Sequence, residues 1–242
     1  MNRIARVALA AIACTVVVVP TSAVADDVSA PPIGGIEAPQ PRGELPLRAG
    51  DTGPFLSLLH ERLSWLGYRI AADERAERRF GDSTGAALGA FARKFGIARS
   101  DQVDQRLWDD IKSLAGEVGA LPRPCTDVSK AICLDTTQRL LRLVRDGEVV
   151  LTADARFGIP GERTRLGTFS VQRRSRDHFS RLYRTSMPLA LFFSGGQAIH
   201  YSPFFARDGY AGGSHGCVNL RDRAIAQRVY DWAPLGTRVH IT

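Results

Sequence analysis

Residues 214–219 read Ser-His-Gly-Cys-Val-Asn and place an imidazole and a thiol two positions apart. In an extended segment the side chains of positions i and i+2 point the same way, so we expect His215 and Cys217 on one face, with no bulk from Gly216 between them. A thiol attacks as its thiolate, and a neighbouring imidazole favours that form. The pattern therefore predicts a cysteine nucleophile beside a histidine base.

His200 is a second candidate for this chemistry. It ends an apolar run, and the thirteen residues from Tyr201 to Gly213 separate it from Ser214. Other interpretations stay open at this point. His215 and Cys217 could bind a zinc ion or form a buried structural pair, and His200 could be an ordinary hydrogen-bonded strand residue.

This constellation resembles the catalytic domain of the bacterial L,D-transpeptidases of the YkuD type. Their pattern is a histidine, a loop, and then Ser/Thr-His-Gly-Cys-x-Asn/Arg. The six residues from Ser214 to Asn219 match that motif without a departure, and the loop after His200 is at the short end of the family's range.

The resemblance implies a peptidoglycan L,D-transpeptidase, which is an acyltransferase. Cys217 would attack the carbonyl of the third residue in a tetrapeptide stem, release D-Ala and leave a thioester. The side-chain amine of a diamino acid in a second stem would then take the acyl group and form a 3→3 cross-link. The resemblance also implies that a carbapenem, which presents a strained carbonyl, is a covalent inhibitor at the same thiol.

The resemblance assigns roles to the residues around the thiol. His215 would be the base, and the backbone carbonyl of Tyr201 would orient it. The backbone N–H groups of Gly216 and Cys217 would stabilise the oxyanion. His200 would complete the catalytic set. The side chains expected to bind substrate are those of Ser214, Asn219 and Arg221.

Two alternative functions stay open. A cysteine hydrolase such as an L,D-carboxypeptidase would cut the same stem and use water as the acceptor. A non-catalytic protein would bind the cell wall or a metal through the same residues. No nucleotide-binding loop, glycosidase carboxylate pair or metalloprotease helix is recognisable in the sequence, so we expect neither a cofactor nor a metal.

The N-terminal residues predict export. Arg3 and Arg6 precede an apolar run from Val7 to Val19, and Ala23-Val24-Ala25 is a small-residue cleavage site. We expect residues 1–25 to be a signal peptide, which places the mature protein in the cell wall or periplasmic space. The apolar run is too short for a comfortable membrane span, so none is expected after its removal.

The chain is basic, with a formal net charge of +7 that falls to +5 when Arg3 and Arg6 leave with the signal peptide. A basic exported protein is attracted to an anionic polymer, so we expect the cell wall as a partner beside the stem peptides. Nearly all the basic residues are Arg, a bias that gives no sign of nucleic-acid binding. The sequence does not predict an oligomeric state.

The cysteine count gives an independent indication. Four cysteines are encoded, and Cys14 lies in the predicted signal peptide. An odd number of cysteines in an exported protein points to one free thiol. Cys125 and Cys133 flank a short loop and are the natural disulfide, which leaves Cys217 free.

The chain before residue 120 divides into a linker and a helical segment. Residues 26–45 are rich in Pro, Gly and Ala and predict a disordered linker. Residues 46–119 follow a helical period, with helices beginning near Pro54, Asp82 and Asp104. This segment resembles the three-helix peptidoglycan-binding domain, which implies wall binding; a spacer or folding role is the alternative. The matching residues are Gly50, Gly53, Leu59, Leu63, Leu66-Gly67-Tyr68, Phe80-Gly81, Thr84, Phe91, Gly96 and Trp108.

After residue 120 the apolar period changes to two, which is typical of strands. One hairpin is expected around Asp146-Gly147 and another around Ser194-Gly195-Gly196. One good helix is expected, from about Asp222 to Trp232, just after the motif. The predicted fold therefore has two domains: a small all-α three-helix domain at 46–119 and a mostly β catalytic domain at 120–242.

Overall fold

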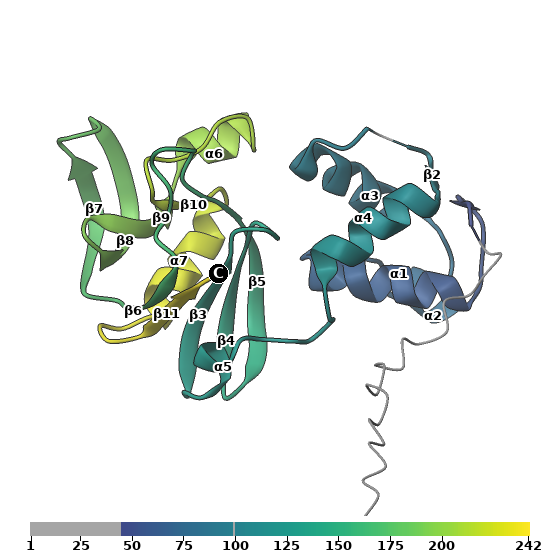
Figure 1. Cartoon of the computed structure of the whole chain (residues 1–242), viewed down its shortest axis with the longest axis horizontal. Helices are drawn as coiled ribbons and strands as arrows, with labels where there is room; N and C mark the ends of the chain where they lie inside the picture. The colour runs from purple at the N-terminus through teal and green to yellow at the C-terminus, as the bar shows by residue number, and fades with distance from the viewer. Residues whose placement is uncertain (1–44, 99) are drawn as a thin grey trace, which may run out of the picture. The chain divides into compact units, whose positions relative to one another are not determined.

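A computed structural model describes residues 45–98 and 100–242. The predicted signal peptide and the predicted linker up to residue 44 lie outside the described residues. Within the described ranges no helix is long and apolar enough to cross a membrane. A helical segment is followed in sequence by a mostly β segment (Figure 1).

Three helices of the helical segment follow the predicted pattern: α1 (Pro54–Trp65), α3 (Asp82–Phe95) and α4 (Gln105–Ala115). Pro54 is the first residue of α1, where its missing N–H costs nothing. Asp104 caps α4 by accepting a hydrogen bond from the Leu107 N–H at 2.8 Å. The apolar faces of these helices form one core that contains the buried Trp108. Two short strands, β1 (Leu47–Arg48) and β2 (Gln102–Val103), pair with each other.

The prediction of three helices is incomplete, because a fourth, short helix, α2 (Ala72–Glu77), precedes α3. Its Glu74 accepts hydrogen bonds from the backbone N–H groups of Gly81, Ser83 and Thr84 and from the Thr84 hydroxyl. Desolvation alone would raise the pKa of Glu74, but the hydrogen bonds from Thr84 and Ser83 lower it to about 2. A carboxylate from the preceding helix thus satisfies the free N–H groups that begin α3.

A nine-stranded sheet dominates the rest of the chain, in the order β6-β11-β3-β4-β5-β10-β9-β8-β7 (Figure 1). Neighbouring strands are antiparallel except for two parallel pairs, β9 with β10 and β3 with β11. This confirms the predicted mostly β segment. The strands are β3 (Lys130–Asp135), β4 (Leu140–Arg145), β5 (Glu148–Arg156), β6 (Gly167–Ser170), β7 (Arg173–Ser180), β8 (Thr185–Ser194), β9 (Gln197–Tyr201), β10 (Val218–Leu220) and β11 (Arg238–Ile241).

The sequence pattern predicts some of these elements and misses others. Both hairpins form at the predicted turns, between β4 and β5 and between β8 and β9. Strand β3 is buried on both faces and therefore shows no alternation, and β7 is a largely polar strand at the edge of the sheet. Helix α7 (Arg223–Trp232) follows the motif, as predicted. Two short helices before the motif, α5 (Arg123–Thr126) and α6 (Pro203–Asp208), were not predicted.

The core of the β segment lies between the sheet and α7. The buried side chains of Ala226, Val229 and Tyr230 face the apolar residues of the strands. The sheet also curls, because Phe169 of β6 packs on Phe193 of β8 with ring centroids 5.6 Å apart, although these strands lie far apart in the strand order. The curl closes one apolar core on the concave side of the sheet and leaves the strand ends free to carry polar groups.

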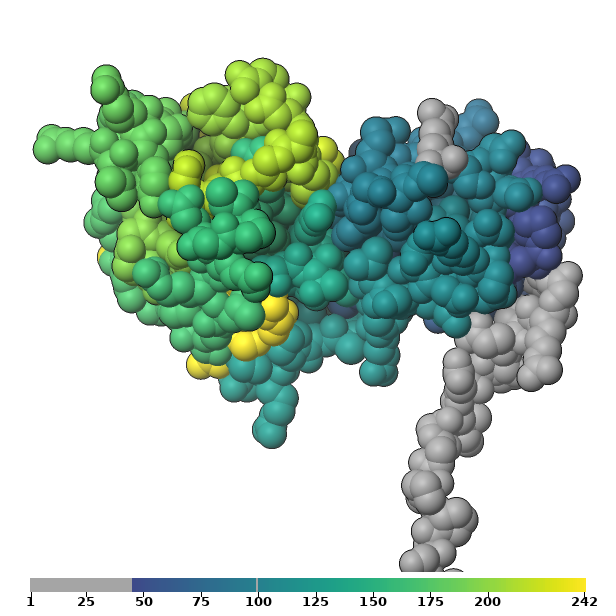
Figure 2. Space-filling model, turned by 45° about the horizontal axis from the view of Figure 1, so that its top comes forward, coloured from purple at the N-terminus to yellow at the C-terminus, as the bar shows by residue number. Residues whose placement is uncertain are grey.

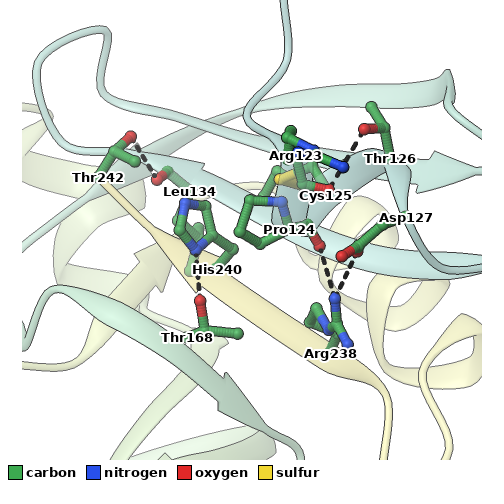
Figure 3. The surroundings of a disulfide bond; sticks show 11 residues. Arg123, Pro124, Cys125, Thr126, Asp127, Leu134, Thr168, Arg238, His240 and Thr242 are labelled. Atoms are coloured by element: carbon green, nitrogen blue, oxygen red, sulfur yellow. Dashed lines mark hydrogen bonds and ion pairs between the residues drawn. A yellow bond between two sulfur atoms is a disulfide. The ribbon is translucent and has the colours of Figure 1, made fainter.

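Cys125 of α5 and Cys133 of β3 form the predicted disulfide. Arg238 of β11 also holds α5 in place, because it donates a hydrogen bond to the Pro124 carbonyl and pairs with the Asp127 carboxylate (Figure 3). In the chain-entropy description, a loop this short contributes about 2.5 kcal/mol of stability when it is closed by a disulfide. Among the described residues Cys217 is the free cysteine.

Candidate active site

Three neighbouring strands bring polar residues into one row across the sheet. Arg156 ends β5 and pairs with Asn219 of β10, and Asn219 pairs in turn with His200 of β9. Directly opposed residues on adjacent strands point to the same face, so these three side chains lie side by side. All three are buried, with no more than 6% of the residue surface exposed.

The His200 ring is held at both nitrogens. Nδ1 donates to the backbone carbonyl of Tyr201 at 2.6 Å, and Nε2 lies 3.0 Å from the amide nitrogen of Asn219. Desolvation lowers the pKa of His200 to about 4, although the Tyr201 hydrogen bond acts in the opposite direction. The ring is therefore neutral at pH 7, with its proton on Nδ1 and a lone pair on Nε2. The carbonyl predicted to orient the base thus contacts His200.

Residues 214–217 form a turn and not the extended segment that the i, i+2 pattern predicts. Gly216 has a φ of 100°, which residues with a side chain rarely adopt. A Cβ at this position would also overlap the amide of Gln197. That amide holds the chain at residues 163–165 by bonding the Arg163 carbonyl and the Arg165 N–H. The glycine of the motif therefore allows the turn to lie close against Gln197.

Ser214 fastens both ends of this turn. Its hydroxyl donates to the Cys217 carbonyl. Its N–H donates to the Phe157 carbonyl at 3.0 Å, and its carbonyl accepts from the Ile159 N–H at 3.0 Å. Ser214 therefore positions the backbone that carries the thiol, while its predicted contact with substrate stays a prediction.

The Cys217 side chain is half-buried against an apolar cluster of Met187, Ala190, Phe192 and Ala198. Desolvation raises the pKa of the thiol, and a hydrogen bond from the Ala198 backbone offsets part of that rise. The thiol is consequently protonated at neutral pH. A reaction at Cys217 then requires a base that removes the proton as the sulfur attacks.

The His215 ring has different surroundings from the His200 ring. It stacks on Tyr183, with ring centroids 4.2 Å apart and an angle of 18° between the planes. Its Nε2 is 3.6 Å from a carboxylate oxygen of Glu162, and 53% of its side chain is exposed. The two histidines of the pattern are therefore one buried, hydrogen-bonded ring and one solvent-facing ring that lies against an aromatic side chain.

These residues surround a cavity of about 400 Å³, a volume in the range of small-molecule sites. One wall consists of His200, Ser214, His215, Cys217 and Asn219. The lining also includes Tyr183 and Arg184, from the turn between β7 and β8, together with residues of α6. Figure 2 shows this hairpin (green) and the segment around α6 (yellow-green) beside each other on the surface.

The chain matches the family model of the YkuD type, described as the L,D-transpeptidase catalytic domain, over residues 129–241. It is also 30% identical to the L,D-transpeptidase of Xylanimonas cellulosilytica, with 85% of this chain and 100% of that chain covered and a TM-score of 0.48. The chain belongs to the YkuD family of L,D-transpeptidases. The helical segment lies outside the residues that the family model matches.

One solved L,D-transpeptidase shares the fold. The enzyme of Stackebrandtia nassauensis is 22% identical, with 81% of this chain and 94% of that chain covered and a TM-score of 0.54. A further L,D-transpeptidase, solved in complex with imipenem, is 24% identical over 47% of this chain and 59% of that chain, with a TM-score of 0.44. No curated protein matches the chain.

In this L,D-transpeptidase the structure brings five predicted side chains to one cavity and leaves one outside it. Arg221 is not among the lining residues. Its guanidinium pairs with Asp154, whose other oxygen accepts from Lys94 Nζ at 2.8 Å. The backbone N–H groups of Gly216 and Cys217 belong to the turn, and their role toward an oxyanion stays a prediction.

Sequence reasoning misses three residues around the L,D-transpeptidase site: Arg156, Glu162 and Tyr183. Each comes from a segment far from the motif in sequence, so no local spacing connects it to Cys217. Of the three, only Arg156 stands out in the sequence, because it is a cation between the apolar residues Ala155 and Phe157 at the end of a strand. Register across the sheet, and not sequence distance, places it beside Asn219.

Proposed function

We propose that this chain is a peptidoglycan L,D-transpeptidase that forms 3→3 cross-links through a thioester at Cys217. The observation that carries the proposal is the Cys217 thiol in one cavity with a neutral His200 whose Nε2 is unprotonated, within a YkuD domain. Family membership supports the reaction class. The half-buried thiol and the neutral imidazole support nucleophilic catalysis by cysteine.

In each half of the proposed reaction, His200 takes up one proton and gives it back. The thiol passes its proton to His200 Nε2 as the sulfur bonds to the carbonyl carbon of the third stem residue. His200 then gives that proton to the leaving amine, and the C–N bond to D-Ala breaks. In the second half the amine of another stem attacks the thioester, His200 takes its proton, and the sulfur leaves as the thiol.

We assign the role of base to His200, whereas the sequence analysis favours His215. A base that must be neutral before the reaction needs a pKa below the working pH and an unprotonated ring nitrogen. His200 meets both requirements, because burial lowers its pKa and the Tyr201 carbonyl holds its proton on Nδ1. His215 lies stacked on Tyr183 in solvent, where it suits contact with substrate.

A second cavity favours transpeptidation over hydrolysis. It measures about 380 Å³ and shares Arg156, Gly212 and Gly213 with the cavity that contains Cys217. Two stems must approach one thiol from different directions, so adjoining cavities suit a donor and an acceptor. An L,D-carboxypeptidase uses water as its acceptor and needs only the first cavity.

Mass spectrometry of products formed from a disaccharide-tetrapeptide tests the proposal. A cross-linked dimer, with loss of one D-Ala per link, is the expected product. Tripeptide without dimer would replace the transpeptidase by an L,D-carboxypeptidase. Unchanged tetrapeptide, under conditions in which the protein is folded, would favour a non-catalytic wall-binding protein.

We also propose a two-domain, exported protein in which residues 46–119 are a peptidoglycan-binding-like domain that holds the catalytic domain, residues 120–242, on the wall polymer. A signal peptide at 1–25 would direct it to the cell wall or periplasmic space, and residues 26–45 would link the signal peptide to the helical domain. The separate core that contains Trp108 supports a helical domain. The Cys125–Cys133 disulfide fits an oxidising compartment, and the basic charge fits an anionic wall.

Residues 120–242 expressed alone are expected to react with an acyl donor as the mature chain does but to sediment less with insoluble peptidoglycan. The chemistry lies wholly in this stretch, and Asp154 keeps its Arg221 partner when Lys94 is removed. Intact mass after incubation with a carbapenem measures the first property, and a pull-down with purified wall measures the second. Circular dichroism establishes that the shortened chain is folded. Equal sedimentation of both chains, or a folded but unreactive short chain, would contradict the division of roles.

A further inference from the structure

Arg156 is a buried cation that, among the described residues, forms no direct salt bridge; the Asp208 carboxylate acts on it only at longer range. Only 6% of its surface is exposed. Its guanidinium donates to the Gly209 carbonyl at 3.1 Å and to the Asn219 Oδ1 at 3.3 Å, and it lies over the Phe205 ring at 5.1 Å. Burying a guanidinium costs free energy unless the charge is paired and hydrogen-bonded, so the partners of Arg156 call for an explanation. The neighbour of Asn219 on its other side is His200.

A guanidinium has donors and no acceptor, so only the oxygen of the Asn219 amide can face it. The amide nitrogen Nδ2 must then point the other way, toward His200 Nε2, which lies 3.0 Å from it. A nitrogen that accepts from an amide carries a lone pair and no proton. The proton of the neutral ring stays on Nδ1, which donates to the Tyr201 carbonyl.

We propose that Arg156 is a positioning residue for the reaction: it fixes the orientation of the Asn219 amide, and this keeps His200 neutral, with its proton on Nδ1 and an unprotonated Nε2 whose lone pair accepts from the Asn219 N–H until the thiol proton replaces that hydrogen bond. The proposal rests on the proposed function, in which His200 is the base. It assigns to Arg156 no contact with the reacting atoms.

The alternative state that Arg156 excludes is an amide turned by 180°. Asn219 Oδ1 would then face Nε2 and the Tyr201 carbonyl would still face Nδ1, so two acceptors would stabilise the imidazolium. An imidazolium has no lone pair and cannot act as a base. The titratable and charged groups that act on His200 from neighbouring strands are Arg156 on β5 and His178 on β7, and both favour the neutral ring. The Cys217 thiol, just before β10, shares its cavity.

Two substitutions distinguish a role of Arg156 in orienting the Asn219 amide from a role in packing alone. Arg156→Lys keeps a donor-only cation, so Asn219 keeps its orientation. Arg156→Gln has an amide that donates or accepts, so Asn219 is free to turn. We expect the acid limb of the pH profile for carbapenem acylation to move up by about one to two pH units in Arg156→Gln and to stay in place in Arg156→Lys. The ratio of the Arg156→Lys rate to the Arg156→Gln rate should therefore be largest at low pH and fall as the pH rises.

Nitrogen NMR of the histidine rings supplies a readout that does not depend on activity, with the His200 signals assigned by their loss in His200→Gln. In the full mature chain at pH 7 we expect a neutral His200 ring protonated at Nδ1. If Arg156→Gln fails to fold, Asn219→Asp replaces it, because a carboxylate facing Nε2 should raise the titration midpoint of His200 even further.

The outcomes are distinct. A proton on Nε2 of wild-type His200 overturns the inference, and so do identical His200 titrations in the wild type, Arg156→Gln and Asn219→Asp. A uniform loss of rate at every pH, shared by Arg156→Lys, makes Arg156 a packing residue and also overturns it. Failure of the proposed function looks different: the wild type forms no cross-link and no Cys217 adduct, while the NMR result for His200 is unaffected.

Discussion

A carbapenem is expected to add one molecule per chain to the wild-type mature protein and none to Cys217→Ala. The strained carbonyl of the drug accepts the sulfur as the stem carbonyl does, and the resulting thioester has no second stem to resolve it. Among the described residues no other free cysteine competes, since Cys125 and Cys133 are joined. Intact mass spectrometry under non-reducing conditions measures the acylation rate, and we expect the rate of Cys217→Ala to be at least about 10⁴-fold below that of the wild type.

Cys217→Ser is the matched variant for this experiment. It is close in size to the cysteine and keeps a side chain that can donate and accept, so the apolar cluster around residue 217 stays packed. A hydroxyl ionises far less readily than a thiol, so we expect Cys217→Ser to be nearly as unreactive as Cys217→Ala. An adduct that persists on Cys217→Ala would assign the nucleophile to another residue.

The second large effect is expected at His200. His200→Gln should slow acylation at neutral pH by about 10² to 10⁴, the range for a lost general base. The glutamine can donate to the Tyr201 carbonyl and accept from Asn219, so it replaces both hydrogen bonds of the ring without its basicity. The rate should recover as the pH rises through the raised pKa of the Cys217 thiol, because the thiolate then forms without a base.

His215→Gln is the control, and it tests the base assignment directly. The substitution removes the stack on Tyr183, and an aromatic pair of this kind is worth about 0.5–1.5 kcal/mol. The acylation rate should therefore fall by no more than about tenfold, with the same pH profile as the wild type. If His215→Gln loses more activity than His200→Gln and alkali restores it, the base is His215, as the sequence analysis predicts. In a zinc site neither loss would be reversed by alkali.

Local order in the sequence determined the reaction class. The run from Ser214 to Asn219, with a histidine at the end of the preceding strand, is specific enough to indicate a YkuD enzyme, because catalysis by a thiol needs those groups close in space and the family keeps most of them close in sequence. The disulfide followed from the cysteine count. Helices α1, α3 and α4 and the two hairpins followed from periods and turn residues that act over a few positions.

Only the tertiary structure decided which histidine is buried, neutral and hydrogen-bonded at both ring nitrogens. The i, i+2 rule places His215 beside Cys217 only if the chain is extended, and Gly216 turns it. His200 gains its role from neighbours on other strands: Asn219 through the parallel pairing of β9 with β10, and Arg156 through the antiparallel pairing of β10 with β5. Register across a sheet depends on how the whole core packs, and burial of the row sets the pKa of the ring. Neither property depends on the residues next to the motif alone. The sequence therefore predicted Cys217 as the nucleophile, and the folded sheet determined the surroundings of His200 on which its proposed role as the base rests.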